Sequence, residues 1–424
     1  MKKRLVFVIF LFISFFYSFA GNSDYFENKT LRIDYFHSGN DTLEFYSIDE
    51  LKEESLWGGS LSNLTDTFNY GHYKFVAYDK ASGKIIFQKN YSSLFAEWRT
   101  TNEAKTVIKS FSETITMPYP KATIKIEFYS RDKKNNWHKK FEYIIDPSSY
   151  FISTEKKNRS SSFKVLYNGD PSKKVDIVII PDGYTREEMA KFKKDCEMFK
   201  SALLGASPFK ENKEKINIWG IEASSLESGP DIPGEDIWKN TAVGSTFYTF
   251  DSERYLMTYD NKNLHDVAAN APYDQIFILV NSNKYGGGGI YNFYGTCSSD
   301  NMYSKYVITH EFGHAFAGLG DEYYDSEVST VGMYPKDVEP WESNLTTLVH
   351  FDKKWKNMLL AETPIPTPSS ENYKNNLGVF EGGGYETKGV YRPSFDCTMK
   401  SASYDNFCGV CKKAIQNMID FYTK

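Results

Sequence analysis

The pattern of apolar and polar positions divides the chain into two parts. In the first part, from about residue 25 to 150, apolar and polar side chains alternate in short runs, as in residues 31–36, 75–78, 85–87 and 122–129. Successive side chains of a strand point to opposite faces, so period-two runs separated by turn residues predict half-buried β-strands. A series of such strands predicts an all-β sandwich.

The second part begins with a different pattern. Three continuous apolar runs bounded by turn residues occupy residues 174–184, 216–221 and 274–280. Runs of this kind are typical of strands that are buried on both faces. After the first run, Thr185 and Glu188 have the spacing of a helical capping box, which predicts a helix between the first two strands. The order of strand, helix and strand predicts an α/β layer.

A polar, serine-rich segment at residues 147–162 separates the two patterns and is predicted to be a linker. Some 400 mature residues are too many for a single core, so two domains are expected. We therefore expect an α+β multidomain protein, with an all-β sandwich over residues 21–160 and an α/β domain over residues 161–424.

The first twenty residues have the features of a secretory signal peptide. Residues 2–4 are basic, residues 5–17 are apolar, and small residues stand at positions 18 and 20. The apolar run is too short for a membrane span, and no later stretch could form one. The mature protein is expected to be secreted, periplasmic or on the cell surface.

Cleavage after residue 20 would leave 47 basic against 55 acidic residues, a formal charge of −8. This negative balance argues against nucleic acid as a partner.

The residues with the clearest chemistry lie in the apolar segment 307–316, where His310 and His314 stand four positions apart. On a helix this spacing places both imidazoles on one face, where they can bind one Zn²⁺. Glu311 follows the first histidine and is predicted to act as the general base on the attacking water.

The third zinc ligand is expected just after the helix. Gly318 and Gly320 should end the helix and let the chain turn back towards the metal. In metzincin peptidases a glycine and a third histidine follow the second histidine by three and six residues. Here Gly318 follows His314 by four residues and Asp321 follows it by seven. We favour Asp321 as the ligand, and Glu322 remains an alternative.

The chain contains five cysteines, an odd number for an exported protein. Cys408 and Cys411 resemble half of a zinc knuckle, but a second C-x-x-C or histidine pair is missing from the sequence. A disulfide among Cys397, Cys408 and Cys411 is therefore favoured over a structural zinc. Cys196 lies in a helical pattern and is predicted to be a buried free thiol.

With these motifs in view, the chain resembles the IgA-peptidase-like zinc metallopeptidases. The blocks that carry the resemblance are IPDGY at 180–184, ESGPDIP at 227–233, TAVGSTF at 241–247, the zinc segment 310–323, YRP at 391–393 and CTM at 397–399. The resemblance covers the whole second domain, and a family-type β-sandwich fits the residues in front of it.

The resemblance implies a metzincin-like catalytic domain in the second half. Met399 would then be the methionine of the turn beneath the zinc, and Tyr404 would be a tyrosine that supports the oxyanion. The implied activity is that of a zinc metalloendopeptidase.

Two functions are compatible with the sequence. The first is a secreted zinc endopeptidase that cleaves extracellular proteins or glycoproteins, a class that includes immunoglobulins. The alternative is a secreted or surface binding protein in which the zinc is only structural. Glu311 favours catalysis, because a structural site has four closed ligands and needs no adjacent base.

Overall fold

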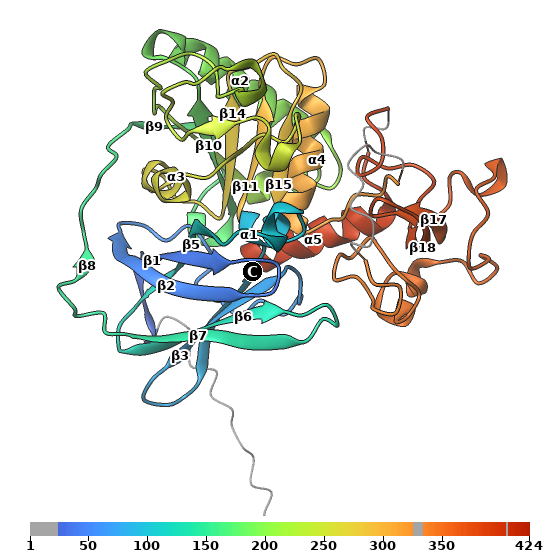
Figure 1. Ribbon diagram of the computed structural model, residues 1–424, viewed down its shortest axis with the longest axis horizontal. Coiled ribbons are helices and arrows are strands. Elements are labelled where there is room, and N and C mark those ends of the chain that lie inside the picture. The colour runs from blue at the N-terminus through green and yellow to red at the C-terminus, as the bar shows by residue number, and fades with distance from the viewer. Residues whose placement is uncertain (1–23, 325–333, 404–405) are drawn as a thin grey trace, which may run out of the picture.

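The computed structural model describes residues 24–324, 334–403 and 406–424. The first part of the chain forms two antiparallel-rich sheets packed against each other, at the bottom of the view in Figure 1. One sheet has the order β5-β1-β2-β8 and the other β4-β3-β6-β7. Their strands are β1 (Phe26–Gly39), β2 (Glu44–Glu54), β3 (Tyr73–Asp79), β4 (Ile85–Tyr91), β5 (Lys109–Pro120), β6 (Ile124–Arg131), β7 (Trp137–Ile145) and β8 (Ile152–Ser153).

The second part is organised around a six-stranded sheet with the order β15-β16-β14-β10-β11-β9. The inner strands are parallel, whereas the edge strands β15 and β9 are antiparallel to their neighbours. The strands are β9 (Ser162–Leu166), β10 (Val175–Asp182), β11 (Ile216–Ile221), β14 (Gln275–Val280), β15 (Gly287–Ile290) and β16 (Tyr294–Ser298).

The remaining elements are helices and short hairpins. The helices are α1 (Leu94–Trp98), α2 (Met189–Gly205), α3 (Asn261–Ala268), α4 (Ser304–Ala317) and α5 (Gly409–Thr423). The hairpins pair β12 (Ser245–Thr246) with β13 (Met257–Thr258), and β17 (Phe380–Gly383) with β18 (Glu386–Arg392). The β17–β18 hairpin, which comes between α4 and α5 in the chain, lies at the right of Figure 1.

The apolar run of β10 serves two hydrophobic cores. Ile177 and Ile179 pack in a cluster with side chains of α2, α4 and α5. Val178 and Ile180 belong to a second cluster on the other face of the sheet, which contains α3 and the β-sandwich. The run is continuous because both faces of the strand are buried.

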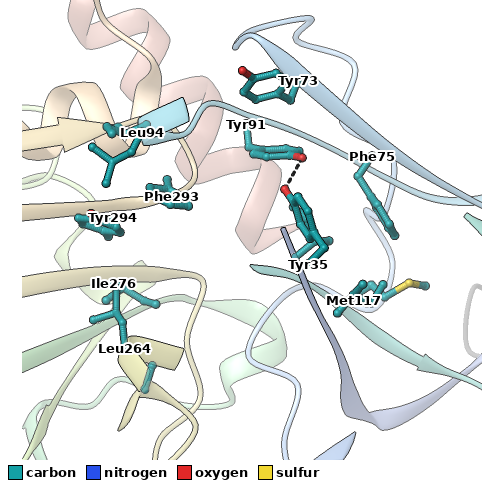
Figure 2. Packing of buried hydrophobic residues seen from close by; sticks show 14 of the residues in the cluster. Tyr35, Tyr73, Phe75, Tyr91, Leu94, Met117, Leu264, Ile276, Phe293 and Tyr294 are labelled. Carbon is teal, nitrogen blue, oxygen red and sulfur yellow. Dashed lines mark hydrogen bonds between the residues drawn. The ribbon is translucent and has the colours of Figure 1, made fainter. Parts of the chain in front are cut away.

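The second cluster extends without a break from the sandwich to the α/β sheet. Figure 2 shows residues of this cluster from both parts of the chain. Tyr35 and Tyr91 come from the sandwich and Leu94 from α1, whereas Ile276 comes from strand β14 of the α/β sheet. The Oη atoms of Tyr35 and Tyr91 are 2.6 Å apart and form a hydrogen bond. The two parts of the chain are therefore packed together by a shared apolar core.

The fold expected from the sequence is confirmed: a β-rich first part precedes a mixed α/β sheet. The three predicted inner strands and the helix between the first two are present, and Thr185 and Glu188 form the predicted capping box. The segment predicted as a linker contains the short strand β8, which pairs with β2.

Candidate metal centre

Helix α4 carries both histidines and ends where the glycines predicted. Gly318 caps the helix with φ 58° and ψ 36°, a left-handed conformation that glycine adopts without the steric cost of a Cβ atom. Its backbone N–H donates to the carbonyl of His314 at 3.0 Å. The chain then reverses, which brings Asp321 back towards the helix.

The side chains of His310, His314 and Asp321 converge on one point. The two Nε2 atoms are 3.1 Å apart, and Asp321 Oδ1 lies 3.1 Å from that of His310 and 3.2 Å from that of His314. The three atoms thus form a nearly equilateral triangle. Tetrahedral bonds of about 2.0–2.1 Å to one zinc ion would separate its ligand atoms by about 3.3 Å. The triangle has the size of one face of such a site.

The hydrogen bonds behind the imidazoles fix which ring nitrogens face this point. His310 Nδ1 lies 3.0 Å from the backbone carbonyl of Thr398, and His314 Nδ1 is bonded to the carbonyl of Leu319. A carbonyl can only accept, so each Nδ1 carries a proton and the Nε2 of the neutral ring presents a lone pair. Asp321 Oδ1 is buried and has no hydrogen-bond donor. Three acceptor atoms in contact fit a cation between them.

Asp321 is held by a tyrosine from the β17–β18 hairpin. The hydroxyl of Tyr385, at the turn between β17 and β18, donates to Asp321 Oδ2. Burial favours the neutral acid, but the two imidazoles outweigh it and hold the pKa of Asp321 well below its usual range. Burial likewise opposes charge on His314, and the Asp321 carboxylate raises the pKa of this imidazole to about 9, so a cation that binds Nε2 must displace a proton from it. The aspartate is therefore ionised and available as a ligand.

Glu311 lies one residue after the first histidine and next to the edge strand β15. Burial raises the pKa of its carboxyl group. A Cβ atom on Gly289 would lie 2.2 Å from the Glu311 carbonyl oxygen, so only glycine fits at this point of the strand. The bare strand lets the helix turn that carries Glu311 approach the sheet edge. A raised pKa suits a base that must accept a proton and release it again.

Glu322, the alternative third ligand, points away from the histidines. Its Oε1 accepts hydrogen bonds from Asn344 Nδ2 at 3.0 Å and from Cys411 Sγ at 3.2 Å. Its backbone N–H donates to the carbonyl of Met399 at 2.8 Å. The structure brings Asp321, and not Glu322, to the two imidazoles.

Met399 lies against the helix that carries the histidines. It is fully buried, and a Cβ atom on Gly313 would be 2.9 Å from its Sδ. The methionine therefore packs on the helix turn between His310 and His314. Tyr404, and the signal peptide predicted at residues 1–20, lie outside the described residues.

Several neighbours of the site were not predicted. Tyr306 Oη donates to the Thr398 carbonyl at 3.1 Å and lies 3.2 Å from His310 Nδ1. It stands one helical turn before His310, a spacing that could have suggested the contact. Tyr385 gave no such signal, because 64 residues separate it from Asp321.

The first part of the chain also contributes an ionisable group near the histidine cluster. Burial raises the pKa of Glu97, in helix α1, to about 7, and its carboxylate accepts a hydrogen bond from Tyr255. The charges of His314, Glu311 and Asp321 act on the same carboxyl group. A carboxyl group from the first part of the chain therefore belongs to the electrostatic surroundings of the cluster.

All five cysteines are free and buried in the structure. This confirms the prediction for Cys196. The disulfide expected among the other cysteines is not formed: Cys397 Sγ and Cys411 Sγ lie 3.9 Å apart, and Cys408 is adjacent to both.

Across residues 24–324, 334–403 and 406–424, every helix is too short or too polar to cross a bilayer. The family model described as IgA Peptidase M64 matches residues 163–376 and 369–419, and the model described as Peptidase M64 N-terminus matches residues 21–142. No curated protein matches the chain significantly. The two family models span both parts of the fold and include the segment with the histidines, so the chain belongs to the IgA peptidase M64 family and is a peptidase.

Proposed function

We propose that this peptidase is a zinc-dependent endopeptidase that hydrolyses peptide bonds of extracellular proteins or glycoproteins. The observation that supports it most strongly is the triangle of His310 Nε2, His314 Nε2 and Asp321 Oδ1, with sides of 3.1–3.2 Å. Two imidazoles and one carboxylate are the protein ligands of many catalytic zinc sites, where a fourth position stays open for water or substrate.

In this proposal His310, His314 and Asp321 hold the metal, and the groups behind them fix their orientation. The carbonyls of Thr398 and Leu319 keep the Nε2 lone pairs directed at one point. The chemistry that a bound Zn²⁺ would supply is polarisation of the scissile carbonyl and activation of a water.

Glu311 is proposed as the general base and acid. It accepts a proton from the attacking water and delivers it to the amine that leaves when the peptide bond breaks. Its place beside His310 on α4 supports this role, because the side chain emerges next to the triangle without being part of it. Its raised pKa brings the carboxylate closer to the range in which it can both accept and return a proton.

Two further parts of the proposal rest on the sequence. We propose that the peptidase is exported, because residues 1–20 combine a basic start, an apolar stretch and small residues at the cleavage positions. We also propose that Tyr404 supports the oxyanion of the tetrahedral intermediate. Tyr404→Phe should then lower kcat and leave the metal content unchanged.

A mixed peptide library incubated with the metal-loaded mature protein tests the activity and its subsite preference together. We expect cleavage inside the peptides, because an endopeptidase needs no free terminus. Glu311→Gln should keep the fold and the metal but lose at least about 10²–10⁴-fold in turnover, the usual contribution of general acid–base catalysis. Glu214→Gln, which changes an exposed glutamate in the same way, is the matched control.

Two results would contradict the proposal. If Glu311→Gln kept both its zinc and the wild-type cleavage rate, Glu311 would not be the base. If the zinc-loaded wild type cleaved no peptide or protein in a broad screen, the alternative of a binding protein with a structural zinc would be favoured.

A further inference from the structure

A second group of potential metal ligands lies beside the first. Glu322, Cys397, Cys408 and Cys411 are buried, and one potential ligand atom from each lies within 4.8 Å of the others. They come from three separate segments: the turn after α4, the segment before Met399, and the start of α5. The two cysteines that looked like half of a zinc knuckle are thus joined by two more ligands that are distant in the sequence.

The distances in this group fit a tetrahedral metal site. Cys397 Sγ and Cys411 Sγ are 3.9 Å apart, and Cys411 Sγ lies 3.2 Å from Glu322 Oε1. Zinc bonds of about 2.3 Å to sulfur and about 2.0–2.2 Å to oxygen imply separations near 3.8 Å between two sulfurs and about 3.6 Å between sulfur and oxygen. A disulfide between the two sulfur atoms would require about 2.05 Å.

The carboxylate of Glu322 needs a partner that the described residues do not supply in full. Its side chain is completely buried, and its Oε2 has no hydrogen-bond donor. The charge of Arg392 acts on it, and that guanidinium donates hydrogen bonds to the carbonyls of Glu381 and Gly382. A buried carboxylate oxygen without a donor is costly, and coordination to a cation removes this cost.

The sulfur atoms are placed as thiolates would be. The backbone N–H of Cys408 donates to Cys397 Sγ at 3.2 Å, and that of Cys411 donates to Cys408 Sγ at 3.5 Å. Cys408 is the N-cap of α5, so the helix dipole also favours negative charge there. Backbone donors and a helix N-terminus both stabilise the deprotonated sulfur that binds metals.

We propose that Glu322, Cys397, Cys408 and Cys411 bind a second metal ion, and that this ion is a structural Zn²⁺. Thiolates select zinc over the hard ions magnesium and calcium. Four protein ligands close the coordination sphere, so water and substrate have no position at this metal. The centre ties α5 to the turn that follows α4.

The second centre also supports the first. Glu322 is the direct neighbour of Asp321, and Cys397 is the direct neighbour of Thr398, whose carbonyl is bonded to His310. Each pair therefore contributes one residue to each centre. A metal that fixes Glu322 and Cys397 also fixes the backbone from which Asp321 and the Thr398 carbonyl are presented.

Cobalt substitution of the full mature chain tests this inference without any mutation. Co²⁺ bound by thiolates absorbs in the near ultraviolet through sulfur-to-metal charge transfer, whereas Co²⁺ bound by imidazoles and a carboxylate has no such band. We expect this band in the wild type, and about two zinc ions per chain by elemental analysis before the exchange. Wild-type protein without the band, or with a disulfide among Cys397, Cys408 and Cys411 after purification without reductant, would overturn the proposal.

Variants then assign the band to its ligands. His310→Ala combined with His314→Ala should retain it, so a failure of the first metal site can be distinguished from a failure of the second. Cys408→Ser combined with Cys411→Ser should abolish it, whereas Cys196→Ser, which changes a buried thiol of α2, should not. If the double cysteine variant does not fold, Glu322→Gln provides the test. It should weaken metal retention against a chelator at least about 10-fold, and unchanged retention would overturn the role of Glu322.

Discussion

The His–His–Asp centre and the Cys–Cys–Cys–Glu centre lie side by side and share one stretch of chain, the turn that presents Asp321 to the first and Glu322 to the second, yet their surroundings differ. The first has three converging ligand atoms and a carboxyl group, Glu311, beside them. The His314 side chain is 15 % exposed there. The second has four ligands, of which Glu322, Cys397 and Cys411 are completely buried. An open site with a neighbouring base suits catalysis, whereas a closed site suits structure.

The difference shows how adjacent residues can serve separate purposes. Asp321 and Glu322 are chemically similar neighbours in a segment without helix or strand, where consecutive side chains are free to point to opposite sides. Asp321 turns to the imidazoles and Glu322 to the thiols. In the same way, Cys397 Sγ faces the other cysteines, whereas the carbonyl of the next residue, Thr398, faces His310. One backbone can therefore hold a reactive centre on one side and a rigid support on the other.

Removing each centre in turn should give the largest contrast. His310→Ala combined with His314→Ala should lower kcat/KM at least about 10³-fold, since the proposed zinc would contribute several kcal/mol to the transition state as a Lewis acid. Cys408→Ser combined with Cys411→Ser should instead lower the free energy of unfolding by at least about 3 kcal/mol, because structural zinc contributes directly to folding. Peptide cleavage and denaturant unfolding measure the two effects.

Cys297→Ser serves as the control for the cysteine pair, because it changes another buried thiol that belongs to neither centre. The comparison would fail if the histidine variant lost as much stability as the cysteine variant. The comparison would also fail if the histidine double variant and the cysteine double variant both lost activity and kept their stability.

Replacing each of the two neighbouring acids by its amide sharpens the comparison further. Asp321→Asn should lower activity and metal retention at the first centre at least about 100-fold, because it removes the charge of a direct ligand. Glu322→Gln should leave activity within about 10-fold and reduce the thiolate band of the cobalt protein. Each change is isosteric, so packing differs little. The opposite assignment of effects would make Glu322 the third ligand of the histidine centre.

The sequence was sufficient for the parts of this arrangement that depend on local spacing. The pair His310 and His314, the helix that presents them and the glycine that ends it follow from a four-residue interval and a left-handed cap. Three inner strands of the α/β sheet, β10, β11 and β14, follow from apolar runs that are buried on both faces. Such features are determined within one turn or one strand, where side-chain periodicity is reliable.

The parts that could not be predicted depend on contacts between distant segments. Cys408 and Cys411 alone favoured a disulfide, because the sequence does not show that Glu322 lies next to them in space. The choice between Asp321 and Glu322 depended on the path of a turn, which periodicity does not describe. Tyr385 reaches the site from a hairpin 64 residues beyond Asp321. Only the fold brings these groups together.

Tyr385→Phe should have an intermediate effect, confined to the first centre. Loss of the hydroxyl leaves Asp321 Oδ2 without its donor, and removal of such an outer hydrogen bond typically lowers metal affinity about 10–100-fold. A chelator competition with the cobalt protein should show this loss at the histidine centre and no change in the thiolate band. Tyr391→Phe, in strand β18 of the same hairpin, is the control. Equal weakening of both centres would mean that the hairpin had shifted as a whole.

The smallest effect is expected from Met399→Leu, which probes the position between the centres. The Met399 side chain packs on Gly313 of α4, and its backbone carbonyl accepts the N–H of Glu322. Leucine keeps the volume and the backbone bond, so the cost should be below about 1.5 kcal/mol of unfolding free energy. Because only the packing under the histidine helix changes, cleavage should fall by no more than a few fold, and the thiolate band should stay the same. Loss of the band would show that the side chain, and not only the backbone, of Met399 couples the two centres.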